Sequence, residues 1–241
     1  PASNVVISAA TTPTAISFAG TRTKASAVAK WTAGFTATAS GSLAAGDTVT
    51  VTFPGTWSGI PASPAVTFGG SFSGCGAGAT GSTSGSVVTI TLPSGCTLAN
   101  SASGTVAIAG ITNPAAATYT NTNFKVHTSS DATDASPVSN VVISAATAVT
   151  AVSFSAGSST YGASTTWTVG FTATASGSLA AGDRLTITFD SGFSSGLPAS
   201  PSITFGGSFS GCGAGATGST SSNVVTVTLP SGCTLANSAA A

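Results

Sequence analysis

Apolar side chains alternate with hydroxyl or glycine positions in the stretch Trp31-Thr32-Ala33-Gly34-Phe35-Thr36-Ala37-Thr38. The same alternation returns far along the chain in Trp167-Thr168-Val169-Gly170-Phe171-Thr172-Ala173. Successive side chains of a β-strand point to opposite faces of the sheet. Each stretch therefore predicts a strand with one apolar face and one face rich in hydroxyl groups.

Runs with the same period of two surround these stretches. They are predicted at residues 48–53, 66–68, 87–92, 105–111, 124–128 and 185–189. Ser-Gly, Ala-Gly-Asp and Asn-Pro clusters separate them, as turns require, and no segment has a helical period. Seven or so short strands per repeat predict an all-β fold made of tandem antiparallel β-sandwiches of immunoglobulin-like type.

An internal repeat predicts the domain organisation. Residues 3–10, 35–47 and 69–81 return almost unchanged as residues 139–146, 171–183 and 206–218, a period of about 136 residues. A period this long matches a whole small domain with its own core. We expect a first sandwich at residues 1–137 and a second at 138–241, which is C-terminally incomplete because it has no counterpart of residues 103–137.

The cysteines form two pairs with the same spacing. Cys75 and Cys96 are 21 residues apart, as are Cys212 and Cys233. A spacing reproduced within each repeat predicts one disulfide per repeat, and no histidine or second pair within a repeat completes a tetrahedral zinc site. Disulfides persist in oxidising compartments, so the protein is expected outside the cytoplasm.

The composition excludes several classes of partner. Only 4% of the residues are charged and the formal net charge is zero, which leaves no basic surface for nucleic acid or for anionic lipids. No apolar run approaches the ~20 residues of a membrane-spanning helix, so we expect no membrane insertion in this segment. Near-zero net charge weakens repulsion between copies and favours self-association.

Few residues are candidates for chemistry. His127 is the only histidine, and its segment has no equivalent in the second repeat, so the chain is not expected to be an enzyme or to bind a cofactor. Asp131 and Asp134 are a weak calcium candidate near the repeat junction, since calcium needs six or more oxygen ligands; a solvated linker is the other interpretation. Asp47 and Asp183 follow Ala-Ala-Gly and are expected to accept backbone hydrogen bonds in turns.

Two further features leave alternatives open. Trp57 and its counterpart Phe193 lie in glycine-rich loops, where they could contact a glycan or could close the end of a sandwich. The threonine row at positions 48, 50 and 52 could order water on an ice-binding face, although threonine is also a preferred exposed residue of strands.

With its repeats, its strand pattern and the Ala-Gly-Asp turn that leads into Thr48-Val49-Thr50-Val51-Thr52-Phe53-Pro54, the chain resembles immunoglobulin-like tandem-repeat domains of prokaryotic cell-surface proteins. Such domains form adhesin stalks, surface fibres and surface layers. Many are reinforced by a Lys–Asn isopeptide bond, but residues 138–241 contain no lysine. The resemblance implies an extracellular or cell-surface location and a spacer, filament or coat role, and it assigns no functional residue.

These observations predict a non-catalytic structural repeat of an extracellular fibre, filament or coat. Its expected partners are neighbouring copies of itself or adjacent repeats. Two interpretations of the incomplete second repeat are open: another chain completes it head to tail by strand addition, or it is a truncated part of a longer repeat array. The alternative is an adhesin-type module that binds surface glycans or, less favoured by the short threonine rows, ice.

Overall fold

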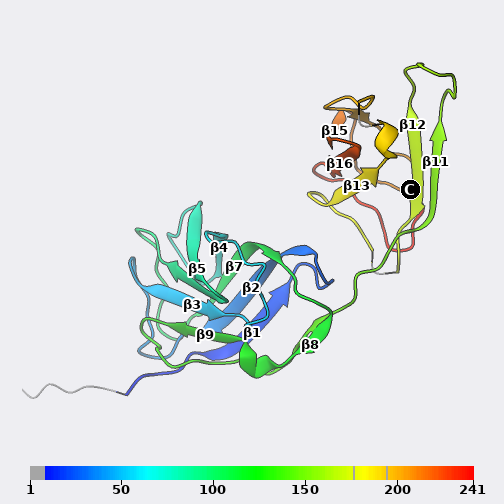
Figure 1. Cartoon of the computed structure of the whole chain (residues 1–241). Helices are drawn as coiled ribbons and strands as arrows, with labels where there is room; N and C mark the ends of the chain where they lie inside the picture. Colours follow the sequence, from blue (N-terminus) through cyan, green and yellow to red (C-terminus); the bar gives the residue numbers. More distant parts are fainter. Residues whose placement is uncertain (1–8, 176, 194) are drawn as a thin grey trace, which may run out of the picture. The chain divides into compact units, whose positions relative to one another are not determined.

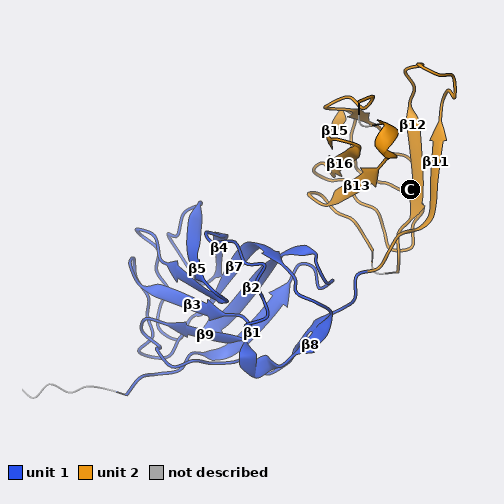
Figure 2. Ribbon diagram, in the orientation of Figure 1, with its two compact units in different colours: residues 1–146 blue, residues 147–241 orange. Residues whose placement is uncertain are grey.

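The computed structural model describes residues 9–175, 177–193 and 195–241 (Figure 1). The chain divides into two compact units, unit 1 at Pro1–Ala146 and unit 2 at Thr147–Ala241 (Figure 2). The described residues form β-strands and two short 3-10 segments, η1 (Asn121–Asn123) and η2 (Ser191–Phe193), with no α-helix among them. The predicted all-β fold is thus confirmed. No described helix is long and apolar enough to cross a membrane.

The described part of unit 1, residues 9–146, contains ten strands. They are β1 (Thr14–Gly20), β2 (Val28–Thr36), β3 (Thr48–Thr52), β4 (Ala65–Gly70), β5 (Ala79–Ser84), β6 (Val87–Thr91), β7 (Ser103–Thr112), β8 (Ala117–Tyr119), β9 (Lys125–Thr128) and β10 (Val141–Ile143). Eight of them form one antiparallel array in the order β1-β2-β7-β4-β5-β6-β3-β9. The first residues of β5 pair with β4, and the rest of β5 pairs with β6. This change of partner within a strand lets the array fold over into two layers, consistent with a β-sandwich.

The core of unit 1 lies between these layers. The predicted parity of β2 is correct, because Trp31, Ala33 and Phe35 are at most 2% exposed. Val49 and Val51 on β3 and Val88 and Ile90 on β6 are fully buried from the other layer. Interior atoms are therefore contributed by both sheets, as the alternating pattern requires.

Strand β7 joins the two halves of this array. It pairs with β2 on one side, where Ile108 lies opposite Trp31, and with β4 on the other, where Ile108 lies opposite Val66 (Figure 1). Val106, Ile108 and Ile111 have no exposed surface. Because both edges of β7 are hydrogen-bonded and one face is buried, its register is strongly specified.

The repeated segment at residues 139–146 belongs structurally to unit 1. It contains β10, which pairs with β8, and Ser144 forms a bridge with Lys24. The compact unit therefore ends at Ala146, after the repeat boundary at residue 137. A repeated sequence shows how long each repeat is. It does not show where one folded unit ends and the next begins, because that depends on which strands pair. The earlier copy of this segment, residues 3–10, lies largely outside the described residues.

Unit 2 repeats the strands of unit 1 from β1 to β6. Its strands are β11 (Thr150–Ala156), β12 (Trp167–Thr172), β13 (Arg184–Thr188), β14 (Ser202–Ile203), β15 (Ala216–Ser221) and β16 (Val224–Thr228). They form two separate antiparallel sheets, β11-β12 and β13-β16-β15-β14. The register is also repeated, since Phe154 faces Val169 as Phe18 faces Ala33.

The two sheets of unit 2 are separate because the β7 position is only begun. Ala240 bridges to Thr172 as Ser103 pairs with Thr36 in unit 1. Among the described residues, unit 2 therefore has counterparts of β1 to β6 and of the first residues of β7.

Candidate functional site

Trp57 lies inside unit 1. Its side chain is 1% exposed, its ring stacks on Phe53 at 5.2 Å, and Trp31 packs against it edge-on at 4.9 Å. Phe124 and Tyr119 complete the aromatic cluster. A ring with no exposed face cannot stack on a sugar from solvent, so the glycan-contact hypothesis does not hold for Trp57 in this structure. Trp57 is part of the hydrophobic core of unit 1.

Phe193 occupies the matching position in unit 2 and is 37% exposed. It packs edge-on against Trp167 at 5.5 Å, and its backbone N–H donates to the carbonyl of Asp190 as that of Trp57 donates to Pro54. The same turn therefore holds both aromatic rings. The difference in their exposure comes from the surroundings rather than from the loop itself.

The two carboxylates near the repeat junction have different partners. Asp131 is completely buried, and its carboxylate accepts hydrogen bonds from the hydroxyl of Thr11 and from both the hydroxyl and the backbone N–H of Thr38. Burial alone would raise the pKa of Asp131, but these hydrogen bonds outweigh that effect and hold it below its usual value. Asp131 is thus a structural tie between residues that are far apart in the sequence.

Asp134 lies at the surface, in a cluster with two basic groups. One carboxylate oxygen accepts from the Lys125 ammonium at 3.0 Å, and the other contacts His127 Nδ1 at 2.8 Å. Hydrogen bonds from Lys125 first and His127 second lower the pKa of Asp134. The carboxylates of Asp131 and Asp134, the two predicted calcium ligands, therefore accept hydrogen bonds from two different sets of protein groups. Among the described residues, no three His, Cys, Asp or Glu side chains form a metal-binding group.

His127 lies on β9, where it pairs with Thr50 of β3. Its Nδ1 contacts the carboxylate of Asp134. An oriented histidine is one component of a nucleophilic triad, but a triad also needs a serine or cysteine within reach of the other ring nitrogen. No hydrogen bond from a described serine or cysteine to His127 accompanies the contact with Asp134. The contact joins a partly exposed histidine on β9 to a surface carboxylate.

The sulfur atoms are paired as the spacing predicts, Cys75 with Cys96 and Cys212 with Cys233. In each unit an isolated antiparallel β-bridge lies next to the disulfide. It joins Ser73 to Thr97 in unit 1 and Ser210 to Thr234 in unit 2. The two disulfides indicate a non-reducing environment. The turn interpretation of the aspartates is also confirmed, because Asp47 and Asp183 accept the backbone N–H of Ala44 and Ala180.

The threonine row of β3 does not form a free face. Thr50 is 9% exposed, and β3 is paired on both sides, with β6 and with β9. An ice-binding surface needs an exposed, regular array of hydroxyl groups, and this row lacks that exposure in unit 1.

Unit 2 has a groove on its surface. The groove has a volume of about 780 Å³ and is lined by side chains of β11, β12 and β13 and of the segment that begins at β14. Its apolar lining includes Phe154, Trp167, Val169, Phe171, Ile187 and Phe205. Their counterparts in unit 1, among them Trp31, Phe35 and Val51, are buried in the core, so the groove is the partly open interior of unit 2.

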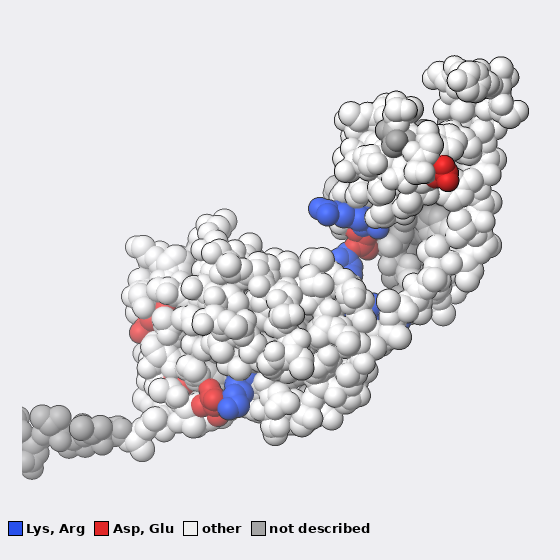
Figure 3. All heavy atoms as spheres, in the orientation of Figure 1, with Lys and Arg blue, Asp and Glu red and all other residues white. Residues whose placement is uncertain are grey.

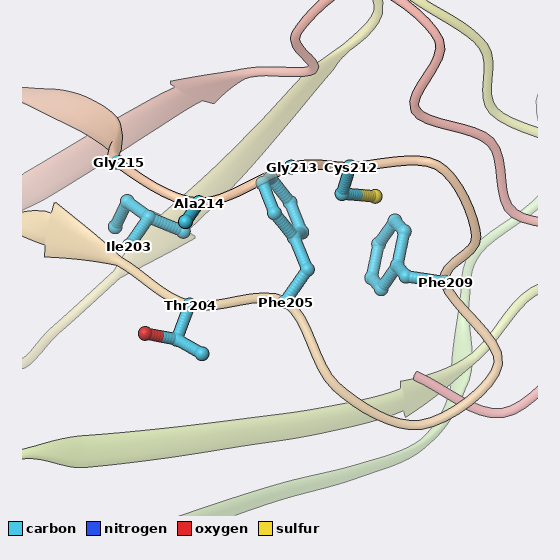
Figure 4. Close-up of a pocket in the computed structure, with 8 residues that line it drawn as sticks. All are labelled: Ile203, Thr204, Phe205, Phe209, Cys212, Gly213, Ala214 and Gly215. Carbon is cyan, nitrogen blue, oxygen red and sulfur yellow. The ribbon is translucent and has the colours of Figure 1, made fainter.

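A smaller pocket of about 320 Å³ adjoins this groove near the second disulfide (Figure 4). The rings of Phe205 and Phe209 lie 4.9 Å apart and point toward the loop that holds Cys212. Phe68 and Phe72 make the same ring pair at 5.0 Å in unit 1. There, Gly104 of β7 lies directly against the Phe72 ring. The small pocket is thus continuous with the groove, since both are lined by Ile203, Thr204, Phe205 and Phe209.

Charge contributes little to either surface. Figure 3 shows few charged side chains, some of opposite sign lying side by side, on a face that is otherwise uncharged. No protein-family model, curated protein or solved structure matches the chain. The functional interpretation therefore depends on the geometry of the units themselves.

Proposed function

We propose that this chain is a non-catalytic structural repeat module of an extracellular surface fibre, filament or coat, built from tandem immunoglobulin-like sandwiches. Neighbouring copies or adjacent repeats are its partners, and strand addition joins them. The observation that carries this proposal is the close-packed interior of unit 1, where Trp31, Trp57, Phe35 and Phe53 are at most 2% exposed. Close-packed interiors have low compressibility, which suits a module that bears load.

The strand order supports the immunoglobulin-like interpretation. The layer β1-β2-β7-β4 has the order A-B-E-D of an immunoglobulin sheet, and β3 pairs with β9 as C pairs with F. The hairpin of β5 and β6 is an addition between strands D and E. These assignments leave a two-layer module whose ends are available for tandem connection.

The disulfides supply the reinforcement that an extracellular module needs. Each closes a loop over a separation of 21 residues, and by loop entropy each contributes about 3 kcal/mol to stability. Both copies carry the bridge at the same place. Reinforcement repeated in this way suits a protein that is exposed to load or to proteases outside the cell.

Single-molecule extension of the full chain tests this role. We expect unit 1 to unfold in one discrete event under load, and reduction of the disulfide to lengthen the event by roughly 70 Å, as 21 residues at about 3.4 Å each require. A chain that extends without a discrete event would contradict the load-bearing role. Hydrolysis of peptide, ester or glycoside substrates that His127→Ala removes would contradict the non-catalytic role.

A further inference from the structure

Residues 137–146 fill a strand-binding site on unit 1. Along one edge, their strand β10 pairs with β8. Along the other, Ser144 donates to and accepts from the backbone of residues 23–25, at 2.8 and 2.9 Å. Val141 and Ile143 are 7% and 2% exposed. The place between β8 and residues 23–25, called the β8 site below, therefore binds an extended segment by its backbone and by alternate apolar side chains.

Two further hydrogen bonds hold the start of this segment. The backbone N–H of Asn121 donates to Asn140 Oδ1 at 2.9 Å. The side-chain amide of Asn121 donates to the carbonyl of Pro137 at 2.7 Å. The β8 site therefore requires an asparagine at one position of its segment, in addition to the two apolar side chains.

Residues 1–10 carry every group that makes these contacts. They are identical to residues 137–146 except at the second position, where Ala2 stands in place of Val138. Val138 is 94% exposed, so the difference falls at a residue that the site does not cover. Residues 1–8 lie outside the described residues, but their sequence makes residues 1–10 a second ligand for the β8 site.

Residues 1–10 cannot reach the β8 site of their own unit. Thr11 precedes β1, whereas the loop at residues 23–25 follows it, and six steps of about 3.3 Å give β1 a span of roughly 20 Å. A chain reaches at most about 11 Å over the three residues from Thr11 to Ser8. Figure 1 also shows the dark blue start of the described chain and β8 at opposite ends of unit 1. The second ligand is therefore directed to another unit.

We infer that the β8 site of one copy of this chain binds residues 1–10 of a second copy as a strand antiparallel to β8. The chain's own residues 137–146 make the same contacts and have the advantage of a high local concentration. They are therefore an intramolecular competitor, and copies join when this segment is exchanged for its counterpart, as in domain swapping. This inference deepens the strand-addition part of the proposed function and rests on it.

A matched set of full-length variants tests the inference. Ile143→Asp places a charge at a buried position and should release the chain's own segment from the β8 site. Copies should then associate head to tail, so the mass measured by sedimentation should rise with concentration. Adding Ile7→Asp, the same change in the second ligand, should weaken this association at least about tenfold. Both variants expose the same empty site, so nonspecific contacts affect them equally.

A synthetic peptide of residues 1–10 measures the contact directly. It should bind the chain with Ile7→Asp and Ile143→Asp at 1:1 stoichiometry by calorimetry. A peptide with Ile7→Asp should bind at least about tenfold more weakly, and a peptide with Ala2→Val should bind equally well. Hydrogen exchange in β2 and β7 checks that unit 1 stays folded, and Ile143→Ala provides the same comparison if Ile143→Asp unfolds it.

Two outcomes would overturn the inference. One is equal association of the Ile143→Asp chain with and without Ile7→Asp. The other is no binding of the peptide to a folded chain whose β8 site has been emptied. Neither outcome changes what single-molecule extension of the unaltered chain reports about unit 1. Failure of this contact between copies and failure of the load-bearing role are thus distinguishable.

Discussion

The two units have similar sequences, but the apolar side chains of unit 2 are more exposed than their counterparts in unit 1. Ile16 is 7% exposed in unit 1, whereas its counterpart Val152 is 55% exposed in unit 2. The hairpins β1-β2 and β11-β12 nevertheless have the same register and the same irregularity. Local sequence is therefore sufficient for strands and hairpins, and long-range pairing with β7 and β9 is what buries their apolar faces.

A second difference concerns a pair of threonines. Thr11 and Thr38 of unit 1 are both hydrogen-bonded to the buried carboxylate of Asp131. Their counterparts Thr147 and Thr174 are hydrogen-bonded directly to each other at 2.9 Å. A buried charge with several donors holds its partners more strongly than a single hydroxyl pair does. The threonines are present in both units, whereas the buried carboxylate that holds them together is described only in unit 1.

The largest effect is expected from a matched pair of tryptophan substitutions. Trp31→Ala should destabilise unit 1 by about 4 kcal/mol, because it leaves a cavity and removes the partner of Asn113. Trp167→Ala should cost unit 2 less than about half of this, since the Trp167 ring is only half-buried. Hydrogen exchange measured on peptides from each unit reports the two free energies separately. Equal losses would contradict the view that unit 2 is open.

The next effect should be the same in both units. Removing Cys75 and Cys96 together, or Cys212 and Cys233 together, should cost about 3 kcal/mol in the unit concerned, because the loops are equally long. Urea denaturation of each double alanine variant measures this loss of stability, with hydrogen exchange in peptides from the altered unit as the readout. A larger loss in unit 2 would mean that its bridge also replaces missing strand contacts.

Asp131 should distinguish the units by their response to acid. Its folded-state pKa lies below the usual value of 3.8, so its contribution is fully present above that value and is lost as the pH falls through the folded pKa. Unit 1 should therefore weaken more steeply than unit 2 below about pH 4. Asp131→Asn should cost about 2 kcal/mol at neutral pH and reduce this dependence, with Asp134 contributing the remainder. Parallel acid curves for wild type and variant would contradict this role.

The strand pattern and the cysteine pairing could be predicted from the sequence because both are local or repeated. Trp31, Ala33 and Phe35 alternate within one strand, and the cysteine spacing occurs twice. The strand β5 was not predicted, because its serines, threonines and glycine give no apolar alternation. It is a strand because β4 and β6 supply its partners.

The candidate site was less predictable, since it depends on pairing over long distances. Trp57 and Phe193 occupy equivalent turns, and only the closure of unit 1 buries the former. The sequence around Asp131 is typical of a linker. The hydrogen bonds that Asp131 accepts from Thr11 and Thr38 could not be predicted, because these residues are far from it in the sequence. The groove also had a signal in the sequence, the counterpart of β7 missing from the second repeat, but that signal did not specify which edges it leaves open.

The smallest effect is expected at Asp134, three residues from the buried carboxylate. Asp134 and Lys125 are 41% and 42% exposed, so water and salt screen their contact. Asp134→Asn should change the stability of unit 1 by less than about 1 kcal/mol, and 1 M salt, with a Debye length of about 3 Å, should remove most of that. Urea denaturation at low and high salt measures both quantities, with Asp131→Asn as the matched control. Because Asp131 is buried and held by neutral donors, its effect should persist in salt. A salt-resistant effect at Asp134 would instead mean that Lys125 and His127 act together as part of the closing contacts of unit 1.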